Sequence, residues 1–476
     1  MYDGFGRTRT IMGPNEIASG STVPTVKYRY WFDHAGIANN DASVKLYRAS
    51  TSNYDPEYAS SGNTIMTDTY SDFLGRIIQT KKDFDWYGSE SRTVSGRTVY
   101  DGLGRAIIQS HPVMEGVTNQ ALNPANNGPS TSSVYDGRDR VISFTDEDNT
   151  IKHTTYTIDN DLFKTTEEVS NEKSESYANA EGKIVQKDDY LDNVPLSTFF
   201  EYNTIGELMS VKDPEGIKTS YDYDLLGRCL HQQHPDKGQT EYEYDQAGNL
   251  IKLTTDNLLN DSTISANFIS YKYDYNRLTG VVLPDLPSGD PNPNNVYYEY
   301  YPSTLANNNA GKIRVKDDGS GTTKYTYGRM GEVLTEVRAV RGYNIPEKYF
   351  KTYFNYDSWN RIKKIKYPDD EIVSYHYDRG GNLKSVDNNQ GETYIQNINY
   401  DHYEQRLMIK YGNGTSQYYA YDGQNRRLRN YSLYSPTNTP MLQNEYKYDE
   451  FSNITGVKNI ASPLANGMGG AYQFDF

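Results

Sequence analysis

A pattern of six residues recurs along most of this 476-residue chain: Tyr-Asp, two variable residues, Gly, and then Arg or Asn. A clear copy is Tyr223-Asp224-Leu225-Leu226-Gly227-Arg228, and an aliphatic residue usually follows the pattern. The copies that begin at Tyr223 and Tyr244 are 21 residues apart, which is the shortest spacing found. Self-similarity at such a period is typical of repeat architectures, so the chain is expected to fold as an array of similar units.

Nine copies satisfy a strict definition, Tyr-Asp with Arg or Asn five positions after the Tyr. The residues that define them, all expected to be structural, are Tyr2, Asp3, Gly6, Arg7, Tyr100, Asp101, Gly104, Arg105, Tyr135, Asp136, Arg140, Tyr223, Asp224, Gly227, Arg228, Tyr244, Asp245, Gly248, Asn249, Tyr356, Asp357, Arg361, Tyr377, Asp378, Gly381, Asn382, Tyr421, Asp422, Arg426, Tyr448, Asp449 and Asn453. Looser copies begin at Tyr70, Tyr202, Tyr273, Tyr327 and Tyr400.

Each unit is predicted to contain two strands and two turns. In the first turn, Asp224 to Gly227, the Asp carboxylate can accept backbone N–H groups two residues on, and Gly adopts positive φ without steric cost. The second turn contains Pro, Asp, Glu or Gly, as in Asp213-Pro214-Glu215-Gly216. Two turns of about four residues leave two strands of roughly 6 to 7 residues, an ordinary strand length.

The two strands of a unit have different patterns. The strand before Tyr-Asp alternates, so that Tyr242 and Tyr244 share one face, and stacked units would align tyrosines across neighbouring strands. After Gly-Arg the aliphatic residues lie three apart, as in Leu250 and Leu253. Because this offset breaks strict alternation, we expect a β-bulge there or a strand that is apolar on both faces.

The repeat divides the chain into two sections of one continuous repeat domain. Residues 1–200 carry widely spaced units with long insertions, notably 34–66 and 112–133, whereas residues 201–476 form a dense array. In the dense array, insertions are expected at 255–268, 284–295, 303–310 and 433–443. Neither end shows a polar capping segment, so we expect a section of a longer repeat protein.

Composition restricts the possible partners. The formal charge of −15 disfavours nucleic acid and anionic membrane surfaces as partners. Hydrophobic residues make up 36% of the chain, and 46 of them are tyrosines, which suits a sheet held by tyrosine ladders better than a thick apolar core. One cysteine, Cys229, excludes a disulfide framework within the chain and is expected to be a small buried residue. No apolar run reaches membrane-spanning length, and no leader precedes the first repeat.

No motif for catalysis, a cofactor or a metal is found, so a non-enzymatic protein without cofactors is expected. His231 and His234 lie three apart on a predicted strand and therefore point to opposite faces. Residues 146–149, Asp-Glu-Asp-Asn, lack the spacing of a calcium loop and occupy the position of a second turn. The repeated Arg could bind an anionic ligand, or it could pair with an Asp or a Tyr of an adjacent unit; its recurrence with the repeat favours pairing.

These residues resemble the YD-repeat, or Rhs-repeat, family, which includes bacterial Rhs proteins, shell-forming subunits of insecticidal toxin complexes and animal teneurins. The resemblance covers nearly the whole chain. Within the family, three segments are most similar to the toxin-complex branch: residues 2–7, residues 72–83 and residues 94–101.

The resemblance implies an all-β fold in which antiparallel β-hairpin repeats form a spiralling, curved sheet, part of a hollow β-shell. Such a shell encloses a C-terminal toxin or effector polypeptide for secretion or delivery. The implied partners are that polypeptide, the remaining parts of the shell and a delivery-complex subunit, and the implied location is secreted or at the cell surface. The family's self-cleaving core segment has no counterpart here: Asp213 to Gly216 resembles one of its elements but lies in an ordinary repeat turn.

A second hypothesis is a cell-surface carbohydrate-binding module, because tyrosines on repeated hairpins also occur in cell-wall-binding repeats. Those repeats usually carry Gly-Trp pairs. The three tryptophans of this chain, Trp31, Trp86 and Trp359, lie outside any repeating position, which favours the shell.

The turn assignment predicts that Gly227→Val destabilises the protein by more than about 1 kcal/mol, because a β-branched residue resists positive φ. Thermal unfolding of the purified variant measures this effect. An unchanged melting temperature would contradict the turn assignment.

Overall fold

The computed structural model describes residues 1–32, 46–54, 64–117, 122–123, 128–170, 172–261, 267–286, 288–289, 292–302, 309–342, 345–449, 452–461 and 472–475. Five of the expected insertions lie wholly or partly outside these residues: 34–66, 112–133, 255–268, 284–295 and 303–310. His34 also lies outside the described residues. The expected insertion at 433–443 is described and contains a hairpin turn closed by a bond from Ser435 N to Thr439 O of 2.9 Å.

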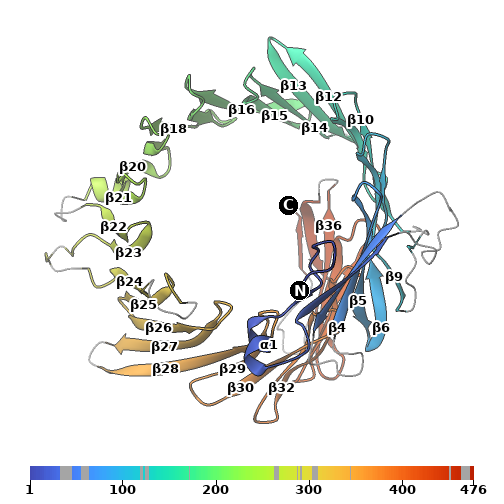
Figure 1. Ribbon diagram of the computed structural model, residues 1–476. Helices are drawn as coiled ribbons and strands as arrows, with labels where there is room; N and C mark the ends of the chain where they lie inside the picture. The colour runs from blue at the N-terminus through green and yellow to red at the C-terminus, as the bar shows by residue number, and fades with distance from the viewer. Residues whose placement is uncertain are drawn as a thin grey trace. The chain divides into compact units, whose positions relative to one another are not determined.

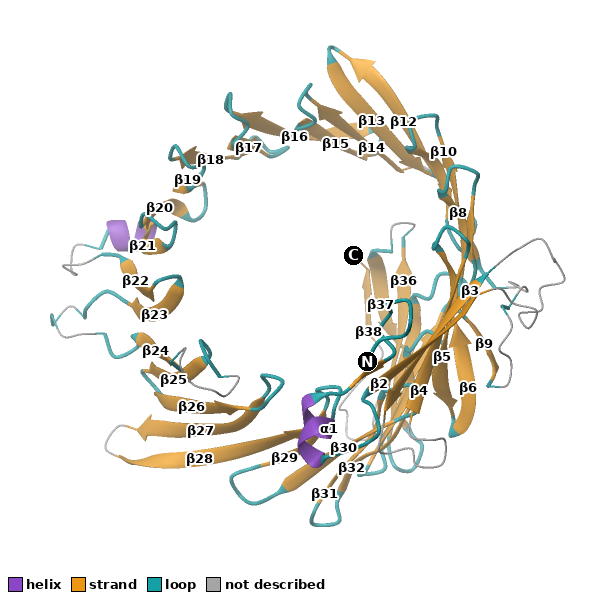
Figure 2. Ribbon diagram, viewed as in Figure 1, coloured by secondary structure: helices purple, strands orange, loops and turns teal. Residues whose placement is uncertain are grey.

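The described residues are almost entirely β-structure, as Figure 2 shows, and their strands pair antiparallel. The predicted all-β, antiparallel fold is therefore confirmed. Neither of the two helices in the described residues, α1 (Pro14–Ser19) and α2 (Asp256–Leu259), is long and apolar enough to cross a membrane.

The chain divides into two compact units. Unit 1 comprises Met1–His153 and Phe354–Phe476, and unit 2 comprises Thr154–Tyr353. Each is described by itself below. The division at about residue 200 concerned the density of repeats along the sequence and stays a prediction.

Unit 1 contains a seven-stranded sheet built from the N-terminal residues. Its strands, in spatial order, are β1 (Thr10–Ile11), β2 (Val26–Phe32), β3 (Tyr47–Tyr54), β4 (Thr64–Ser71), β5 (Ile77–Trp86), β6 (Ser89–Val94) and β9 (Val113–Gly116).

The remaining strands of unit 1 belong to a second antiparallel ladder. They are β7 (Thr98–Tyr100), β8 (Ala106–Ser110), β10 (Ser130–Tyr135), β11 (Val141–Thr145), β12 (Ile151–Asp159), β29 (Ile362–Lys366), β30 (Ile372–Tyr377), β31 (Leu383–Asn388), β32 (Thr393–Tyr400), β33 (Arg406–Tyr411), β34 (Ser416–Tyr421), β35 (Leu428–Tyr434), β36 (Pro440–Tyr448), β37 (Ile454–Asn459) and β38 (Tyr472–Asp475). Strand β12 continues into unit 2, and β28 (Ile345–Tyr356) enters unit 1 from it.

The seven-stranded sheet contains the most thoroughly buried residues of unit 1. Tyr70 and Phe84 are fully buried, and Leu46, Ile78 and Leu122 pack with Tyr70 in one apolar cluster. Burial raises the pKa of the Tyr70 hydroxyl to about 12. The sequence predicted only widely spaced repeat units here, and this sheet was missed because, apart from the looser copy at Tyr70, most of its strands lack the repeat pattern.

Charged side chains are buried beside these apolar residues. Asp68 of β4 is fully buried and accepts from Arg48 at 2.9 Å, from Arg92 at 2.8 Å and from Ser50. Lys81, also fully buried, pairs with Glu115. Removing one partner of a buried ion pair typically costs about 3–5 kcal/mol, so these residues fix strands β3, β4, β5, β6 and β9 in one register.

Unit 2 is a single antiparallel ladder whose strands follow one another in sequence order (Figure 1). Its strands are β13 (Leu162–Val169), β14 (Glu172–Ala178), β15 (Ile184–Leu191), β16 (Val194–Tyr202), β17 (Leu208–Lys212), β18 (Lys218–Tyr223), β19 (Cys229–His234), β20 (Gly238–Tyr244), β21 (Leu250–Thr255), β22 (Ile269–Asp274), β23 (Arg277–Val282), β24 (Val296–Tyr300), β25 (Ile313–Asp318), β26 (Gly321–Tyr327) and β27 (Val333–Gly342). The strand length expected from the repeat is confirmed, since β18 to β21 have six or seven residues each.

The β-bulge expected after Gly-Arg is also present. Tyr244 pairs with Leu250 and Glu243 pairs with Lys252, so that Ile251 is the extra residue. The same shift recurs after Leu208, Leu383 and Ile454. The bulge explains why aliphatic residues three apart occur where strict alternation would require two or four.

Candidate functional site

The residues that define the repeat meet in a contact that we call the YD clip. It consists of the Asp and the Arg of one unit together with the Tyr of the next unit. Asp224 begins the clip at the end of β18: its Oδ1 accepts hydrogen bonds from the backbone N of Leu226 at 2.8 Å and of Arg228 at 3.0 Å. A second bond, from Gly227 N to Asp224 O at 3.1 Å, closes the turn, and Gly227 has φ of +79°. The turn chemistry expected from the sequence is therefore present.

Arg228 is held by the other carboxylate oxygen. Asp224 Oδ2 accepts from Arg228 Nε at 2.6 Å and from a terminal nitrogen of Arg228 at 2.5 Å, so two guanidinium nitrogens form charge-assisted hydrogen bonds to one carboxylate oxygen. The hydrogen bonds from Arg228, backbone and side chain, hold the pKa of Asp224 below its ordinary value. For Asp136 in the equivalent position, the pKa is lowered to about 2, chiefly by the side chain of Arg140.

The guanidinium also reaches the next unit. Arg228 lies over the ring of Tyr244, 4.9 Å from its centroid, and donates a hydrogen bond of 2.9 Å to the backbone O of Asp245. One side chain thus fixes its own turn and holds the next turn beside it. The same stacking on the following Tyr occurs at Arg76, Arg105, Arg277, Lys312, Arg361 and Arg427.

The Tyr completes the clip by bonding back to the preceding unit. Tyr223 OH donates to the backbone O of Leu208 at 3.0 Å, and Leu208 is the aliphatic residue that follows the preceding turn. Partial burial raises the pKa of Tyr223. Equivalent bonds of 2.7–3.2 Å are made by Tyr100, Tyr135, Tyr300, Tyr327, Tyr377, Tyr400, Tyr421 and Tyr448.

These contacts correct one expectation about the repeated Arg. Its contact with a Tyr of the adjacent unit is confirmed. Pairing with an Asp of the adjacent unit is present at Arg105, which contacts Asp139 at 2.8 Å, but the recurring partner is the Asp of the same unit, four residues earlier. Such pairs join Asp3 to Arg7, Asp72 to Arg76, Asp101 to Arg105, Asp136 to Arg140, Asp224 to Arg228 and Asp357 to Arg361.

Three of the predicted units carry Asn in place of Arg. Asn249 and Asn453 donate to the carboxylates of Asp245 and Asp449 at 2.8 and 2.9 Å, so the turn is closed without a cation. In the unit of Tyr377 the backbone N of Asn382 donates to Asp378 at 2.8 Å, but its side-chain nitrogen is buried without a hydrogen bond.

In the unit of Tyr421 the sequence assignment is shifted by one residue. The turn closes with a bond from Asp422 N to Arg427 O of 2.8 Å, so this turn is one residue longer than the others. Arg426, which the strict spacing assigned to the Arg position, has φ of +61° and pairs with Asp401 of the preceding unit. Arg427 takes the role of the repeated Arg, since it donates to the backbone O of Asp449 at 3.0 Å.

The comparisons with known proteins agree with this repeat. The family model described as RHS Repeat matches residues 202–239, which contain the clip of Asp224 and Arg228. This part of the ladder is therefore similar to the RHS repeat. The comparison with curated protein sequences gives no match.

Solved structures show the same fold over almost all of this chain. TcdB2-TccC3 matches with a TM-score of 0.77 and 18% identity, covering 98% of this chain and 27% of that chain. The Photorhabdus luminescens Tc holotoxin pore, with a mutation in TccC3, matches with a TM-score of 0.74 and 19% identity, covering 91% and 23%. TcdB2-TccC3 without its hypervariable C-terminal region also has a TM-score of 0.74, at 17% identity and 97% and 27% coverage. This chain thus spans about a quarter of the length of these chains.

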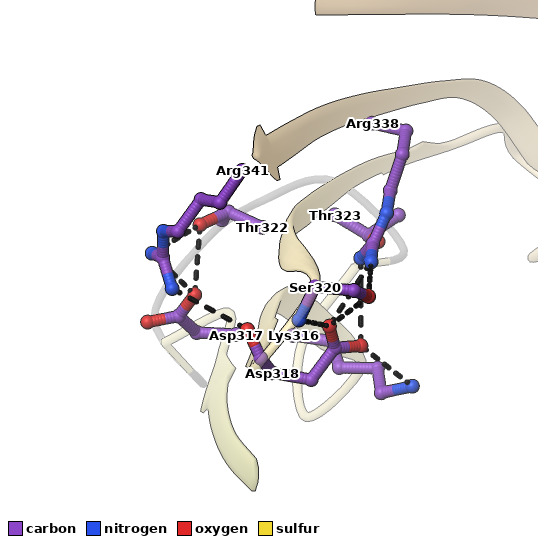
Figure 3. A network of polar contacts seen from close by, with 8 residues as sticks. All are labelled: Lys316, Asp317, Asp318, Ser320, Thr322, Thr323, Arg338 and Arg341. Carbon is purple, nitrogen blue, oxygen red and sulfur yellow. Dashed lines mark hydrogen bonds and ion pairs between the residues drawn. The ribbon is translucent and has the colours of Figure 1, made fainter. Parts of the chain in front are cut away.

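Outside the clips, unit 2 contains a polar network on β25 to β27, shown in Figure 3. Arg338 donates to Asp318 at 3.0 Å, to Thr323 at 2.7 Å and to Ser320. Arg341 pairs with Asp317 at 2.7 Å. The side chains of Arg338 and Ser320 lower the pKa of Asp318, so this carboxylate stays charged and the network reinforces the hairpin of β25 and β26.

A second polar cluster in unit 1 was missed because its residues are far apart in sequence. His111, which follows β8, lies between Glu147 at 2.8 Å and the hydroxyl of Tyr403 at 3.1 Å. Glu147 belongs to residues 146–149, which form the expected turn between β11 and β12. Burial and the neighbouring Asp148 raise the pKa of Asp146 in this turn to about 6.

Three further residues considered in the sequence, Cys229, His231 and His234, lie on strand β19. His231 is exposed and His234 is half-buried, as expected for positions three apart on a strand. Cys229 is half-buried, which corrects the expectation of a buried residue, since the ladder of unit 2 leaves its faces partly open. Among the described residues, no three His, Cys, Asp or Glu side chains gather in a way that could hold a metal ion.

We predict that Arg228→Lys weakens the clip although it preserves the charge. A single ammonium nitrogen cannot replace the two guanidinium nitrogens that contact Asp224 and the third that reaches the backbone O of Asp245. The melting temperature should fall, and amide hydrogen exchange in residues 245–249 should become several-fold faster. The matched control is Arg314→Lys in the exposed pair with Glu299, which should change neither quantity. Equal effects of the two variants would contradict the role of the clip.

We also predict a pH dependence that originates at Asp378. This carboxylate is 3% exposed beside a cavity of about 170 Å³, and burial raises its pKa to about 6. The folded protein therefore holds the proton more tightly than the unfolded chain, and the stability that protonation provides is lost as the pH rises from about 4 through about 6. Asp378→Asn should stabilise the protein at pH 7.5 by an amount of order 2 kcal/mol, and this gain should disappear towards pH 4.

The control for Asp378→Asn is Asp245→Asn, because the side chain of Asn249 holds the pKa of Asp245 below its ordinary value. Asp245→Asn should not stabilise the protein at pH 7.5. Thermal unfolding between pH 4 and pH 7.5 measures both variants, and a pH-independent effect of Asp378→Asn would refute the assignment.

Proposed function

We propose that this chain is a structural part of a protein shell that encloses a toxin or effector polypeptide for secretion or delivery. The observation that carries the proposal is the clipped ladder: consecutive units are joined by the Arg of one unit and the Tyr of the next. The fold shared with TcdB2-TccC3 over 98% of this chain supports it. In this proposal the repeat-defining residues act structurally, and the protein is not an enzyme.

The one-layer sheet of unit 2 is suited to form the wall of a shell. Its described strands form one ladder in sequence order, and their side chains are mostly half-buried or exposed. A one-layer sheet cannot gain much free energy from an apolar core, so its order must come from backbone hydrogen bonds and from contacts such as the clips. A wall of this kind can be extended unit by unit, because each unit contacts chiefly its neighbours.

The partners follow from the same proposal. They are the enclosed polypeptide, the remaining parts of the shell and a subunit that delivers it. We propose that the assembly acts outside the cell that makes it or at its surface. The net charge of −15 disfavours nucleic acid as cargo.

Protease protection tests the proposal. The chain is purified in the assembly in which it occurs, with its cargo polypeptide, and digested with a nonspecific protease. Cargo should remain intact in the assembly and should be cut at least tenfold faster after the assembly has been dissociated in denaturant and diluted back. Cargo that is cut equally fast in both samples overturns the shell, and saturable binding of the chain to cell-wall glycan in that case would favour the carbohydrate-binding alternative.

A further inference from the structure

A lysine, a glutamate and an asparagine meet inside unit 1. Lys81 of β5 is fully buried, and its ammonium group contacts Oε1 of Glu115 of β9. The side-chain nitrogen of Asn123, Nδ2, donates to Oε2 of the same carboxylate at 3.1 Å. One carboxylate therefore contacts a primary amine through one oxygen and a side-chain amide through the other.

The sheet fixes the positions of these three residues. Strand β6 lies between β5 and β9, and Lys81 is opposite Val94 of β6, so the side chains of Lys81 and Glu115 meet over this middle strand. Gln79, which is 1% exposed, holds the backbone of Asn123. It accepts from Asn123 N at 2.9 Å and donates to Asn123 O at 3.3 Å. Groups that are positioned in this way lose little freedom before they react with each other.

Buried side chains shield this contact from water. Tyr70 is fully buried, and the centroid of its ring is 5.8 Å from Lys81 Nζ. Leu122, which precedes Asn123, is 1% exposed and packs with Tyr70. Burial lowers the pKa of the Lys81 ammonium group, although the contact with Glu115 opposes this effect. A desolvated lysine gives up its proton more readily, and the neutral amine is a nucleophile.

The sequence also removes a competing reaction of Asn123. An asparagine can lose its side-chain nitrogen when the backbone N of the next residue attacks Cγ. Residue 124 is a proline, whose backbone nitrogen carries no hydrogen and cannot take part in this reaction. The side-chain amide of Asn123 is therefore retained for another nucleophile.

We propose that Lys81 and Asn123 form an intramolecular isopeptide bond, with Glu115 as the general base and general acid. The Lys81 ammonium group first passes a proton to Glu115, and the lone pair of the neutral Nζ then forms a bond to Cγ of Asn123. Glu115 gives its proton to Nδ2 and accepts one from Nζ. The bond between Cγ and Nδ2 breaks with its electron pair on Nδ2, so that ammonia leaves and Glu115 remains protonated. One amide replaces another, and no oxidant or reductant is required.

The bond joins β5 covalently to the segment that follows β9. A crosslink of this kind limits the conformations of the unfolded chain and holds the edge strand β9 on its sheet. This inference does not depend on the proposed function.

Mass spectrometry of the purified whole chain, unfolded in denaturant, tests the bond. The mass should be lower than the sequence requires by one NH₃. After digestion with trypsin, residues 77–82 should be recovered as a branched peptide joined to residues 106–138, with the branch at Asn123. Two separate linear peptides overturn the proposal. A mass lower by one H₂O, with the branch at Glu115, also overturns it.

Variants test the role of each group. E115Q should lower the yield of branched peptide at least tenfold, because a neutral amide cannot accept and return the proton. N123A should restore the full mass. The matched control is E404Q, since Glu404 pairs with the neighbouring Lys82 in a half-exposed contact. This variant should leave the yield of branched peptide unchanged.

Equal yields of branched peptide from E115Q and E404Q overturn the role of Glu115. Loss of NH₃ that persists in N123A overturns the assignment of the bond to Asn123. If a variant does not fold, the mass and the peptide map of the unmodified sequence still decide whether the bond is present.

Discussion

The ladder of this protein depends on an arginine that contacts two units at once. Its guanidinium fork closes its own turn through an aspartate four residues earlier, and its planar face covers the tyrosine of the following unit. The tyrosine hydroxyl then bonds back across the same boundary. Neighbouring units therefore share a charge pair, a ring contact and a hydrogen bond in addition to their strand pairing. This combination explains how a chain poor in aliphatic residues forms an ordered sheet.

The same turn has a second use at its tip. Because the clip involves only the first and last positions of the turn, the two residues between them are free to vary. In four turns of unit 1, Ser358, Arg379, Tyr403 and Asn425 contact residues from the N-terminal part of the chain. In two other turns of the same unit, Leu74 and Leu103 are exposed. In unit 2 several are aliphatic and exposed. One repeat thus combines a constant structural contact with a variable surface.

The repeat could be predicted from the sequence because its turn chemistry is local. The Asp224 turn, the positive φ of Gly227 and the bulge beside Ile251 all follow from spacing within one unit. It could not be predicted that Arg427, and not Arg426, takes the role of the repeated Arg. Arg426 lies at the expected spacing from Tyr421, and the sequence does not show that this turn is one residue longer. The seven-stranded sheet and its buried Asp68 were missed because the residues that contact Asp68 lie on other strands and only the fold brings them together. His111 and Tyr403, almost 300 positions apart, were missed for the same reason.

The clips also differ in strength along unit 2. Where Arg228 follows Asp224, the boundary has an ion pair and a ring contact, whereas Asn249 makes hydrogen bonds to the Asp245 carboxylate and to the backbone O of Tyr275 without an ion pair. In such a sheet, the contact between neighbouring units is weaker at some boundaries than at others. When the sheet is pulled or bent, separation of neighbouring units is therefore expected to begin at the boundary of Asn249. One side chain, Asn in place of Arg, determines where the sheet opens first.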